Sequence, residues 1–270
     1  RQMCIRDSGY NAGHGLPFDS EGMKERYPDI FFSQFTGAEL VADKWNLSRE
    51  DLDQFALESH QKAAQATESK YFDREILPVE GKNAEGINDL VMADEGIRFD
   101  ASLDKLAGLN PVTEGGKITA GNASQITDGA AAVLICNDAG LKKIKSNPRA
   151  EIVSISVVGD DPVFMLTGPI PASHKALDIA KLSIEDMDIY EVNEAFAPVP
   201  LAWAEELKAD RNKLNVNGGA MALGHPLGAT GAKLMTTMLH ELERREGNYA
   251  LQAICEGGGT ANATIIKRIA

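Results

Sequence analysis

The chain has 270 residues and a formal net charge of −13, with 43% hydrophobic and 25% charged side chains. A globular protein of this length can bury a large core, in one or two domains. The negative charge disfavours nucleic acid and anionic membranes as partners, and the sequence shows neither a signal peptide nor a long apolar run. Three cysteines form no even-numbered disulfide framework, so we expect a cytoplasmic protein.

The first half of the sequence predicts helices joined by loops. Residues 1–8 have no capping or periodic pattern and are expected to be artefactual, and Gly, Pro, Asn and Asp indicate a loop over 9–29. A helix is predicted over 34–46. Ser48 and Asp51 form a weak capping box, which predicts the start of a second helix. The inward face of that helix is expected to hold Leu52, Phe55, Ala56, Ser59 and Ala63.

The middle of the chain carries one predicted strand among loops. Residues 72–80 are expected to be extended, and residues 81–120 to be loop with short elements, because Gly, Asp and Asn are frequent there. The run 132–136 is apolar throughout, which predicts a strand in a sheet that is covered on both faces. Cys136, at its end, is expected to be a core residue, and a helix is predicted over 138–145.

The second half of the chain alternates strands and helices and ends in two adjacent strands. Ser173 follows two prolines and is expected to cap a short helix. The sequence contains no Walker loop, no G-x-G-x-x-G pattern and no internal repeat. We therefore expect a layered α/β unit. Strands are predicted over 152–158, 189–192, 250–255 and 263–268, and helices over 173–181, 195–207 and 227–246.

A cysteine and a histidine stand in two glycine-rich turns. Cys255 ends a predicted strand and is followed, after Glu256, by the glycines at 257–259. Glycine lets backbone N–H groups approach a ligand closely, and a thiol beside such groups can be partly ionised. His225 lies in a Gly-His-Pro turn and is the obvious partner. This pair indicates acyl or carbon–carbon chemistry on a thioester.

Four motifs, in their order and spacing, resemble the thiolase family. They are TAGNASQITDGAA from Thr119, NEAFA from Asn193, NVNGGAMALGHPLGATGAK from Asn215 and CEGGGT from Cys255. Glu256 resembles the acetyl-CoA C-acetyltransferase branch of the family. The resemblance covers almost the whole chain and implies an α/β protein with the thiolase-like layered α-β-α-β-α fold. It also implies an acyltransferase.

The resemblance further implies that one half of this fold is largely missing. The family's nucleophilic cysteine stands in a Cys-Ser-Ser-Gly-like turn, and the sequence contains no such segment; Cys4 is followed by Ile-Arg-Asp. We therefore expect an N-terminally truncated fragment, inactive without the upstream nucleophile and prone to aggregate. The domains implied are a loop (lid) region over 1–125, the tail of the N-terminal half over 126–148 and the C-terminal half over 149–270.

Four catalytic residues are implied by the resemblance. His225 would be the base that activates the nucleophilic thiol or the thiol of coenzyme A. Cys255 would be the second acid/base, which takes the α-proton of an acetyl group in condensation. Asn193 would hold a water that, with His225, binds the thioester oxygen as it becomes an enolate, and the Gly257 N–H would serve the other oxyanion hole. We expect the imidazole and the aimed N–H groups to lower the pKa of Cys255.

The resemblance also implies ligands and partners. Ser124 and Phe196 would line the channel for the pantetheine arm. Acyl-CoA and coenzyme A would be the partners, with coenzyme A as co-substrate. No metal or redox cofactor, no nucleic acid and no membrane would be needed. Homodimers or homotetramers are expected. The reaction would be 3-ketoacyl-CoA thiolysis, as in β-oxidation, or acetyl-CoA condensation. The alternatives are a non-catalytic CoA-binding or structural remnant, and a ketoacyl-synthase-like enzyme, which typically has a second histidine where this chain has Cys255.

Overall fold

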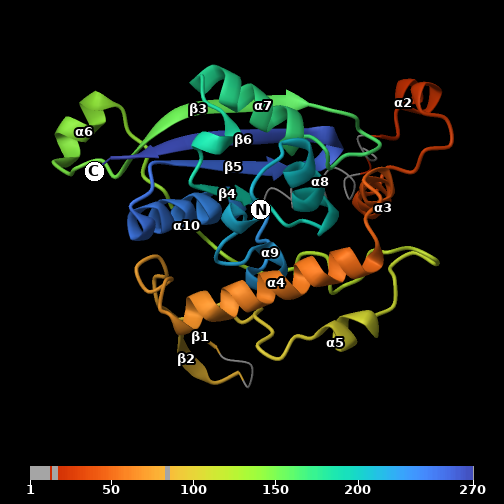
Figure 1. Cartoon of the computed structure of the whole chain (residues 1–270), viewed down its shortest axis with the longest axis horizontal. Helices are drawn as coiled ribbons and strands as arrows, with labels where there is room; N and C mark the ends of the chain where they lie inside the picture. Colours follow the sequence, from red (N-terminus) through yellow and green to blue (C-terminus); the bar gives the residue numbers. More distant parts are fainter. Residues whose placement is uncertain (1–12, 14–17, 83–85, 270) are drawn as a thin grey trace.

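A mixed four-stranded sheet lies at the centre of the structure, a computed structural model that describes residue 13, residues 18–82 and residues 86–269 (Figure 1). Its strands are β3 (Ala150–Gly159), β4 (Ile189–Val192), β5 (Tyr249–Cys255) and β6 (Thr260–Arg268). The order is β3–β6–β5–β4, in which β6 pairs antiparallel with β3 and β5, whereas β5 pairs parallel with β4. These pairings confirm the strands expected in the second half and the α/β class.

Two helices cover opposite faces of this sheet (Figure 1). α7 (Pro169–Ala180) packs on β3 and β6, and α10 (Thr230–Arg245) packs on β4 and β5. Side chains along β5 alternate between the faces, so that Leu251 joins the core cluster of α7 and Ala250 the cluster of α10. Because both faces are covered, β5 is buried at every position after its first.

The helix α7 begins at Pro169 rather than at Ser173. A proline in the first turn of a helix loses no hydrogen bond, and its fixed φ suits the helix. Ser173 therefore lies inside α7, fully buried, and its Oγ accepts a hydrogen bond from Trp203 Nε1 at 2.8 Å. The prediction of Ser173 as a cap is wrong, because its partner is an indole that is distant in the sequence.

The helices α3 (Gln34–Lys44) and α4 (Arg49–Glu68) confirm the two helices predicted in the first half. The Ser48 hydroxyl accepts from the Asp51 N–H at 3.1 Å, and the Asp51 carboxylate accepts from the Ser48 N–H at 2.8 Å, so the capping box is confirmed. All five residues predicted for the inner face of α4 are buried. α4 packs on α9 (Ala220–Leu223), so the first half of the chain lies against the second (Figure 1).

Residues 132–136 do not form the predicted strand. They lie within an irregular segment over 124–137, and their apolar side chains face outward, with Leu134 77% and Ile135 63% exposed. A strand needs a neighbour that pairs with its N–H and C=O groups, and no strand in the described part of the chain pairs with this segment. Cys136 is exposed rather than buried. Both predictions are wrong, because apolar composition does not by itself supply a neighbouring strand.

The remaining elements are short. They are α2 (Glu21–Arg26), β1 (Val79–Lys82), β2 (Asn88–Val91), α5 (Leu103–Ala107), α6 (Asp138–Ile144), α8 (Pro198–Glu206) and 3-10 turns at Ile184–Asp186, Arg211–Lys213 and Gly257–Gly259. Residues 72–80 form a strand only at their end, where β1 pairs with β2, and 81–120 is loop with short elements, as predicted. The expectation for residues 1–8, including Cys4, lies outside the described residues. Within those residues, no helix combines the length and apolarity needed to cross a membrane.

We expect Ser48→Ala to lower the free energy of unfolding by about 1 kcal/mol, because the first turn of α4 loses its side-chain acceptor. Urea unfolding followed by circular dichroism measures this change. Ser146→Ala is the matched control, since Ser146 is exposed and a surface substitution stays within about 0.5 kcal/mol. Equal stability of the two variants would contradict the role of the cap.

Candidate functional site

The carboxyl ends of β4 and β5 place Asn193 and Cys255 at one edge of the central sheet. The two strands are parallel neighbours, with Val192 opposite Ala253. Asn193 follows directly, and its N–H donates to the Ala253 carbonyl at 3.0 Å, whereas Cys255 is the last residue of β5. Ligands of open α/β sheets bind beyond the carboxyl ends of the strands, so this edge is the candidate site.

His225 lies against Asn193. Asn193 Nδ2 is 3.3 Å from His225 Nε2, and His225 Nδ1 is 2.7 Å from Thr230 Oγ1. The Thr230 hydroxyl donates to the Pro226 carbonyl at 3.3 Å, so it accepts the Nδ1–H of the imidazole. We therefore assign the proton to Nδ1, which leaves the Nε2 lone pair facing the amide N–H of Asn193. The structure thus brings together two of the predicted site residues and fixes the tautomer of the histidine.

The protein environment keeps this imidazole neutral. Burial, and to a smaller extent the positive charge of Lys233, lower the pKa of His225 from its ordinary value to about 4. At neutral pH the ring therefore carries no charge. A neutral imidazole whose Nε2 lone pair faces the sheet edge can accept a proton from a thiol there.

The turn that carries His225 depends on a glycine and on a distant glutamine. Gly224 has a φ of 79°, and a Cβ at this position would lie 2.4 Å from the Thr127 side chain, so a glycine is required. The His225 N–H donates to the Gln125 carbonyl at 3.1 Å. The Gln125 side-chain amide donates in turn to the Met221 carbonyl at 2.7 Å. The segment around Gln125 therefore holds the histidine turn in place.

Cys255 is buried and protonated. Burial raises the pKa of its thiol to about 12, and the charge of Glu256 acts in the same direction. The expectation of a lowered pKa is wrong in its net direction. A backbone hydrogen bond at Cys255 does lower the pKa, but burial outweighs it, because the side chain joins the apolar cluster with Ala253 and Ala261, where a thiolate would lose its hydration. Among the described residues no hydrogen bond joins the thiol to His225. The thiol is therefore a proton donor at rest.

The glycine run after Cys255 turns the chain back into β6. It forms the 3-10 turn Gly257–Gly259, in which Gly258 and Gly259 have positive φ. A Cβ on Gly259 would lie 2.8 Å from the Asp160 carbonyl oxygen, so this position requires glycine. Gly257 is exposed and begins the turn, and the first N–H groups of a helix have no acceptor within it. Its part in an oxyanion hole stays a prediction.

A buried carboxyl group ties the end of β4 to α4 and α9. Glu194, directly after Asn193, accepts from the Ser59 hydroxyl at 2.7 Å and from the Asn215 amide at 2.9 Å. It also accepts from the Met221 N–H at 3.1 Å. Burial raises the pKa of Glu194, whereas these three hydrogen bonds stabilise the ionised form. The side chain thus fixes the turn that carries Asn193 against the helix that precedes the histidine turn.

Ser124 and Phe196 are brought together by backbone pairing. The Ser124 N–H donates to the Ala195 carbonyl at 3.0 Å, and Ala123 forms an antiparallel bridge with Phe196. Ser124 is half-buried. The Phe196 side chain is fully buried and packs edge-to-face on Phe35, with ring centres 5.3 Å apart. Phe196 is therefore a core residue here, and the lining of a pantetheine channel by these two residues stays a prediction.

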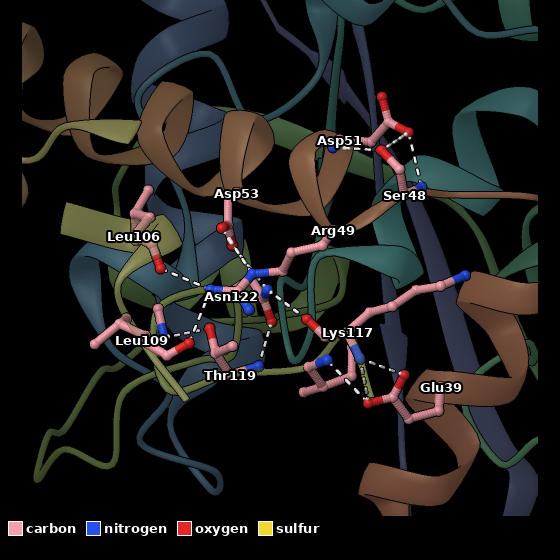
Figure 2. Close-up of polar contacts among 12 residues, drawn as sticks. Glu39, Ser48, Arg49, Asp51, Asp53, Leu106, Leu109, Lys117, Thr119 and Asn122 are labelled. Atoms are coloured by element: carbon pink, nitrogen blue, oxygen red, sulfur yellow. Dashed lines mark hydrogen bonds and ion pairs between the residues drawn. The ribbon is translucent and has the colours of Figure 1, made fainter. Parts of the chain in front are cut away.

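Figure 2 shows how the segment before Ser124 is anchored to the first half of the chain. Asn122 Nδ2 donates to the Asp53 carboxylate on α4 at 2.9 Å, and Asn122 Oδ1 accepts from the Thr119 N–H at 2.8 Å. Asp53 also pairs with Arg49 at 2.7 Å, and Arg49 donates to backbone carbonyls in and after α5. Asn122 is fully buried. It therefore serves to fix the loop that leads to Ser124.

Two residues that position the histidine were missed by the sequence analysis. Thr230 fixes the tautomer of His225, and Gln125 fixes its backbone. A signal for Thr230 was present, because a hydroxyl near the start of a helix stands one turn after His225. No local signal exists for Gln125, because its contact with His225 joins segments that are distant in the sequence.

The chemistry available at this edge is proton transfer and the binding of a developing oxyanion. A neutral imidazole and a protonated thiol can accept and donate protons, and an amide N–H can stabilise negative charge on oxygen. Within the described ranges, no group of three or more His, Cys, Asp or Glu side chains is arranged to hold a metal ion.

Two comparisons by sequence place the chain among known proteins. Residues 18–139 match the family described as thiolase, N-terminal domain, and residues 146–268 match thiolase, C-terminal domain. The chain is 55% identical over 251 residues to a steroid 3-ketoacyl-CoA thiolase of Mycobacterium tuberculosis, covering 93% of the chain and 60% of that protein. It is 41% identical over 273 residues to the mitochondrial 3-ketoacyl-CoA thiolase of Mus musculus, covering 99% of the chain and 68% of that protein.

Solved structures agree with these matches. Human mitochondrial 3-ketoacyl-CoA thiolase superimposes with a TM-score of 0.84 at 45% identity, covering 87% of this chain and 59% of that one. Bacillus anthracis acetyl-CoA acetyltransferase superimposes with a TM-score of 0.85 at 40% identity, covering 90% of this chain and 61% of that one. The chain thus spans about 60% of the length of the M. tuberculosis relative and of both solved structures.

We expect Glu194→Ala to lower the free energy of unfolding by roughly 3 kcal/mol or more, because it removes the acceptor of three buried hydrogen bonds. Urea unfolding measures the change. The matched control is Glu68→Ala, because Glu68 is exposed at the end of α4 and its removal stays within about 0.5 kcal/mol. A loss no larger than that of the control would show that the Glu194 contacts do not hold these segments together.

We expect the imidazole of His225 to titrate with a midpoint near 4, because it is buried beside Lys233. Proton NMR of the ring, assigned with His225→Ala, measures the midpoint. In the unfolded chain the same group titrates at about 6.5. Its contribution to stability is therefore complete above about pH 6.5 and is lost as the pH falls toward 4. A midpoint at or above the unfolded value would refute the neutral, buried state.

Proposed function

The chain belongs to the thiolase family, and from that premise we propose that it acts in acyl transfer between acyl-CoA and coenzyme A or acetyl-CoA. The reaction is 3-ketoacyl-CoA thiolysis or, in reverse, acetyl-CoA condensation. The observation that carries the proposal is the contact of Asn193 with His225 at the sheet edge where β5 ends in Cys255. In this proposal Asn193 supplies the hydrogen-bond donor, His225 the neutral base and Cys255 the protonated thiol. The relatives named above are thiolases and an acetyl-CoA acetyltransferase, and this does not favour the alternative of a ketoacyl-synthase-like enzyme.

In the thiolysis direction each residue has one task. His225 takes the proton of the attacking thiol, whose sulfur bonds to the 3-keto carbon and so keeps the acyl group as a thioester. The imidazolium formed donates its Nε2–H to the thioester oxygen of the departing acetyl-CoA, together with a water held by Asn193. Cleavage of the Cα–Cβ bond leaves its electron pair on acetyl-CoA as an enolate. The Cys255 thiol then gives its proton to the α-carbon. Condensation follows the same path in reverse, with the Cys255 thiolate as the base.

The protonation state of Cys255 before substrate binds is the one that the thiolysis direction requires. Its pKa of about 12 keeps the thiol protonated at neutral pH, which is the form that donates to an enolate. Condensation needs the thiolate, so it also needs a partner that accepts this proton. Protons and an acyl group are all that move, so we propose coenzyme A as co-substrate and no metal or redox cofactor.

We also propose a cytoplasmic location and assembly into homodimers or homotetramers. β3 is an edge strand of the sheet, and its side chains Ile155 and Val157 are 55% and 62% exposed. Exposed apolar side chains on an edge strand mark a surface that another chain can cover. This supports assembly through the β3 side, and sedimentation of the purified chain measures its state.

We expect the chain to exchange the methyl protons of acetyl-CoA with D2O, because this step needs the acid–base pair and no acyl acceptor. Mass spectrometry of acetyl-CoA measures the rate. His225→Ala and Cys255→Ala should each lower the rate by about 100-fold or more. The rate should rise from about pH 7 to about pH 10, because burial raises the pKa of Cys255 and the thiolate fraction grows with pH.

The control for this experiment is Cys136→Ala, because Cys136 is exposed and lies in the irregular segment; its exchange rate should equal that of the parent chain. Coenzyme A binding without exchange would support the non-catalytic CoA-binding remnant instead. Exchange at the parent rate in Cys255→Ala would remove Cys255 from the mechanism. Thiolysis of acetoacetyl-CoA by added coenzyme A then tests the complete reaction.

A further inference from the structure

Three buried side chains on one face of the sheet carry oxygens without partners. Among the described residues, neither carboxyl oxygen of Glu191, nor Asn193 Oδ1, nor Gln252 Oε1 has a hydrogen-bond partner, although the exposed fractions of these residues are 1%, 1% and 3%. Glu191 and Asn193 are two residues apart at the end of β4, so their side chains project to the same face of the sheet. Gln252 on β5 lies opposite Glu191 on β4 in the strand register, and it shares that face. Buried polar atoms are nearly always paired, so these oxygens require a partner.

Two of the three side chains line one small cavity under the start of α10. Its wall includes Glu191 and Asn193 together with Thr230, Lys233 and Thr237, whereas Gln252 does not line it. The cavity has a volume of about 10 Å³, which is close to the smallest that holds a water molecule. A buried water needs two to four polar partners, and this wall supplies them.

Each of three side-chain donors in the wall makes a hydrogen bond elsewhere. The Thr230 hydroxyl donates to a backbone carbonyl, as described above, and the Lys233 ammonium donates to the Leu223 carbonyl at 2.5 Å. The Thr237 hydroxyl donates to Glu75 at 2.8 Å. None of these groups reaches the unpartnered oxygen of Asn193. A water inside the cavity can supply a donor for that oxygen.

The surroundings of Glu191 favour the neutral form of its carboxyl group. Burial raises its pKa well above the ordinary value. The carboxyl groups of Glu194, Glu75 and Glu241 act in the same direction, and Lys62 opposes them. A neutral carboxylic acid has one O–H to donate and a carbonyl oxygen to accept. One water can accept from that O–H and still donate both of its own protons.

We propose that Glu191 is a positioning residue for the Asn193 amide and acts through one water held in this cavity. The water accepts from the Glu191 O–H and donates to Asn193 Oδ1, which leaves Asn193 Nδ2 facing His225 Nε2. The opposite orientation of the amide would set its oxygen against the Nε2 lone pair, which repels it. The catalytic use of this arrangement rests on the proposed function, whereas the water and the amide orientation do not.

The test compares Glu191→Gln and Glu191→Leu with Gln252→Leu in the full chain. Gln252 is the matched control, because it is buried on the same face, its Oε1 also has no partner among the described residues, and it lies outside the cavity. NMR supplies three readouts. They are the signals of the Asn193 side-chain NH2 group, which are assigned with Asn193→Ala, the cross-relaxation of these signals with bound water, and the chemical shifts of the His225 ring nitrogens. None of these needs turnover.

We expect Glu191→Gln to keep the Asn193 signals and the bound water, because a glutamine amide also donates to that water. Glu191→Leu should lose the water contact and shift the Asn193 and His225 signals without loss of stability, because an apolar residue replaces an unpaired buried acid. Gln252→Leu should leave these signals unchanged. Where acetyl-CoA exchange is measurable, it should fall at least about tenfold in Glu191→Leu and stay near the parent rate in Glu191→Gln.

Unchanged Asn193 signals in Glu191→Leu would overturn the proposal, as would the absence of bound water at the Asn193 amide of the parent chain. The second observation needs no variant of Glu191, so it decides the matter even if Glu191→Leu does not fold. A parent chain without exchange activity would refute the proposed function alone, because the NMR signals still report the water and the amide.

Discussion

The buried carboxyl group of Glu194 joins three parts of the chain that hold the site. It accepts hydrogen bonds from Ser59 on α4, from Asn215 and from the backbone of Met221 in α9. The packing around this carboxyl group leaves no room for a side chain at Gly219, because a Cβ there would lie 2.3 Å from the carboxyl carbon. Since three buried hydrogen bonds are lost if the carboxyl group moves, the end of β4 and the turn after α9 are fixed as one unit.

Within this frame, burial decides the charges of the proton-carrying groups. It lowers the pKa of His225 to about 4 and raises the pKa of Cys255 to about 12. Both groups are therefore neutral across the physiological range of pH. In the proposed reaction, charge develops when a thiolate or an enolate forms at this edge, and preorganised donors act where that charge develops. The neutral acid proposed for Glu191 follows the same rule, because an unpaired charge cannot remain in this interior.

The first half of the chain does not form a separate unit but supports the segments of the second half that carry the site. Asp53 on α4 anchors Asn122, and the segment that follows Asn122 pairs with the chain beside Phe196. Gln125, a little further along, accepts the backbone N–H of His225. The loop that carries the Gly-Asn-Ala-Ser motif thus connects the long helix α4 to the histidine turn, and the two halves share one core.

The amino-acid sequence alone determined the elements whose signals are local. The capping box at Ser48, the strand of β4 and the motifs around Asn193 and His225 depend on residues a few positions apart, so they could be recognised without coordinates. Only the tertiary structure decided that the run 132–136 remains exposed and that burial holds the Cys255 thiol in its protonated form. Strand pairing and the pKa of a buried group depend on neighbours that are distant in the sequence, and no local pattern specifies those neighbours.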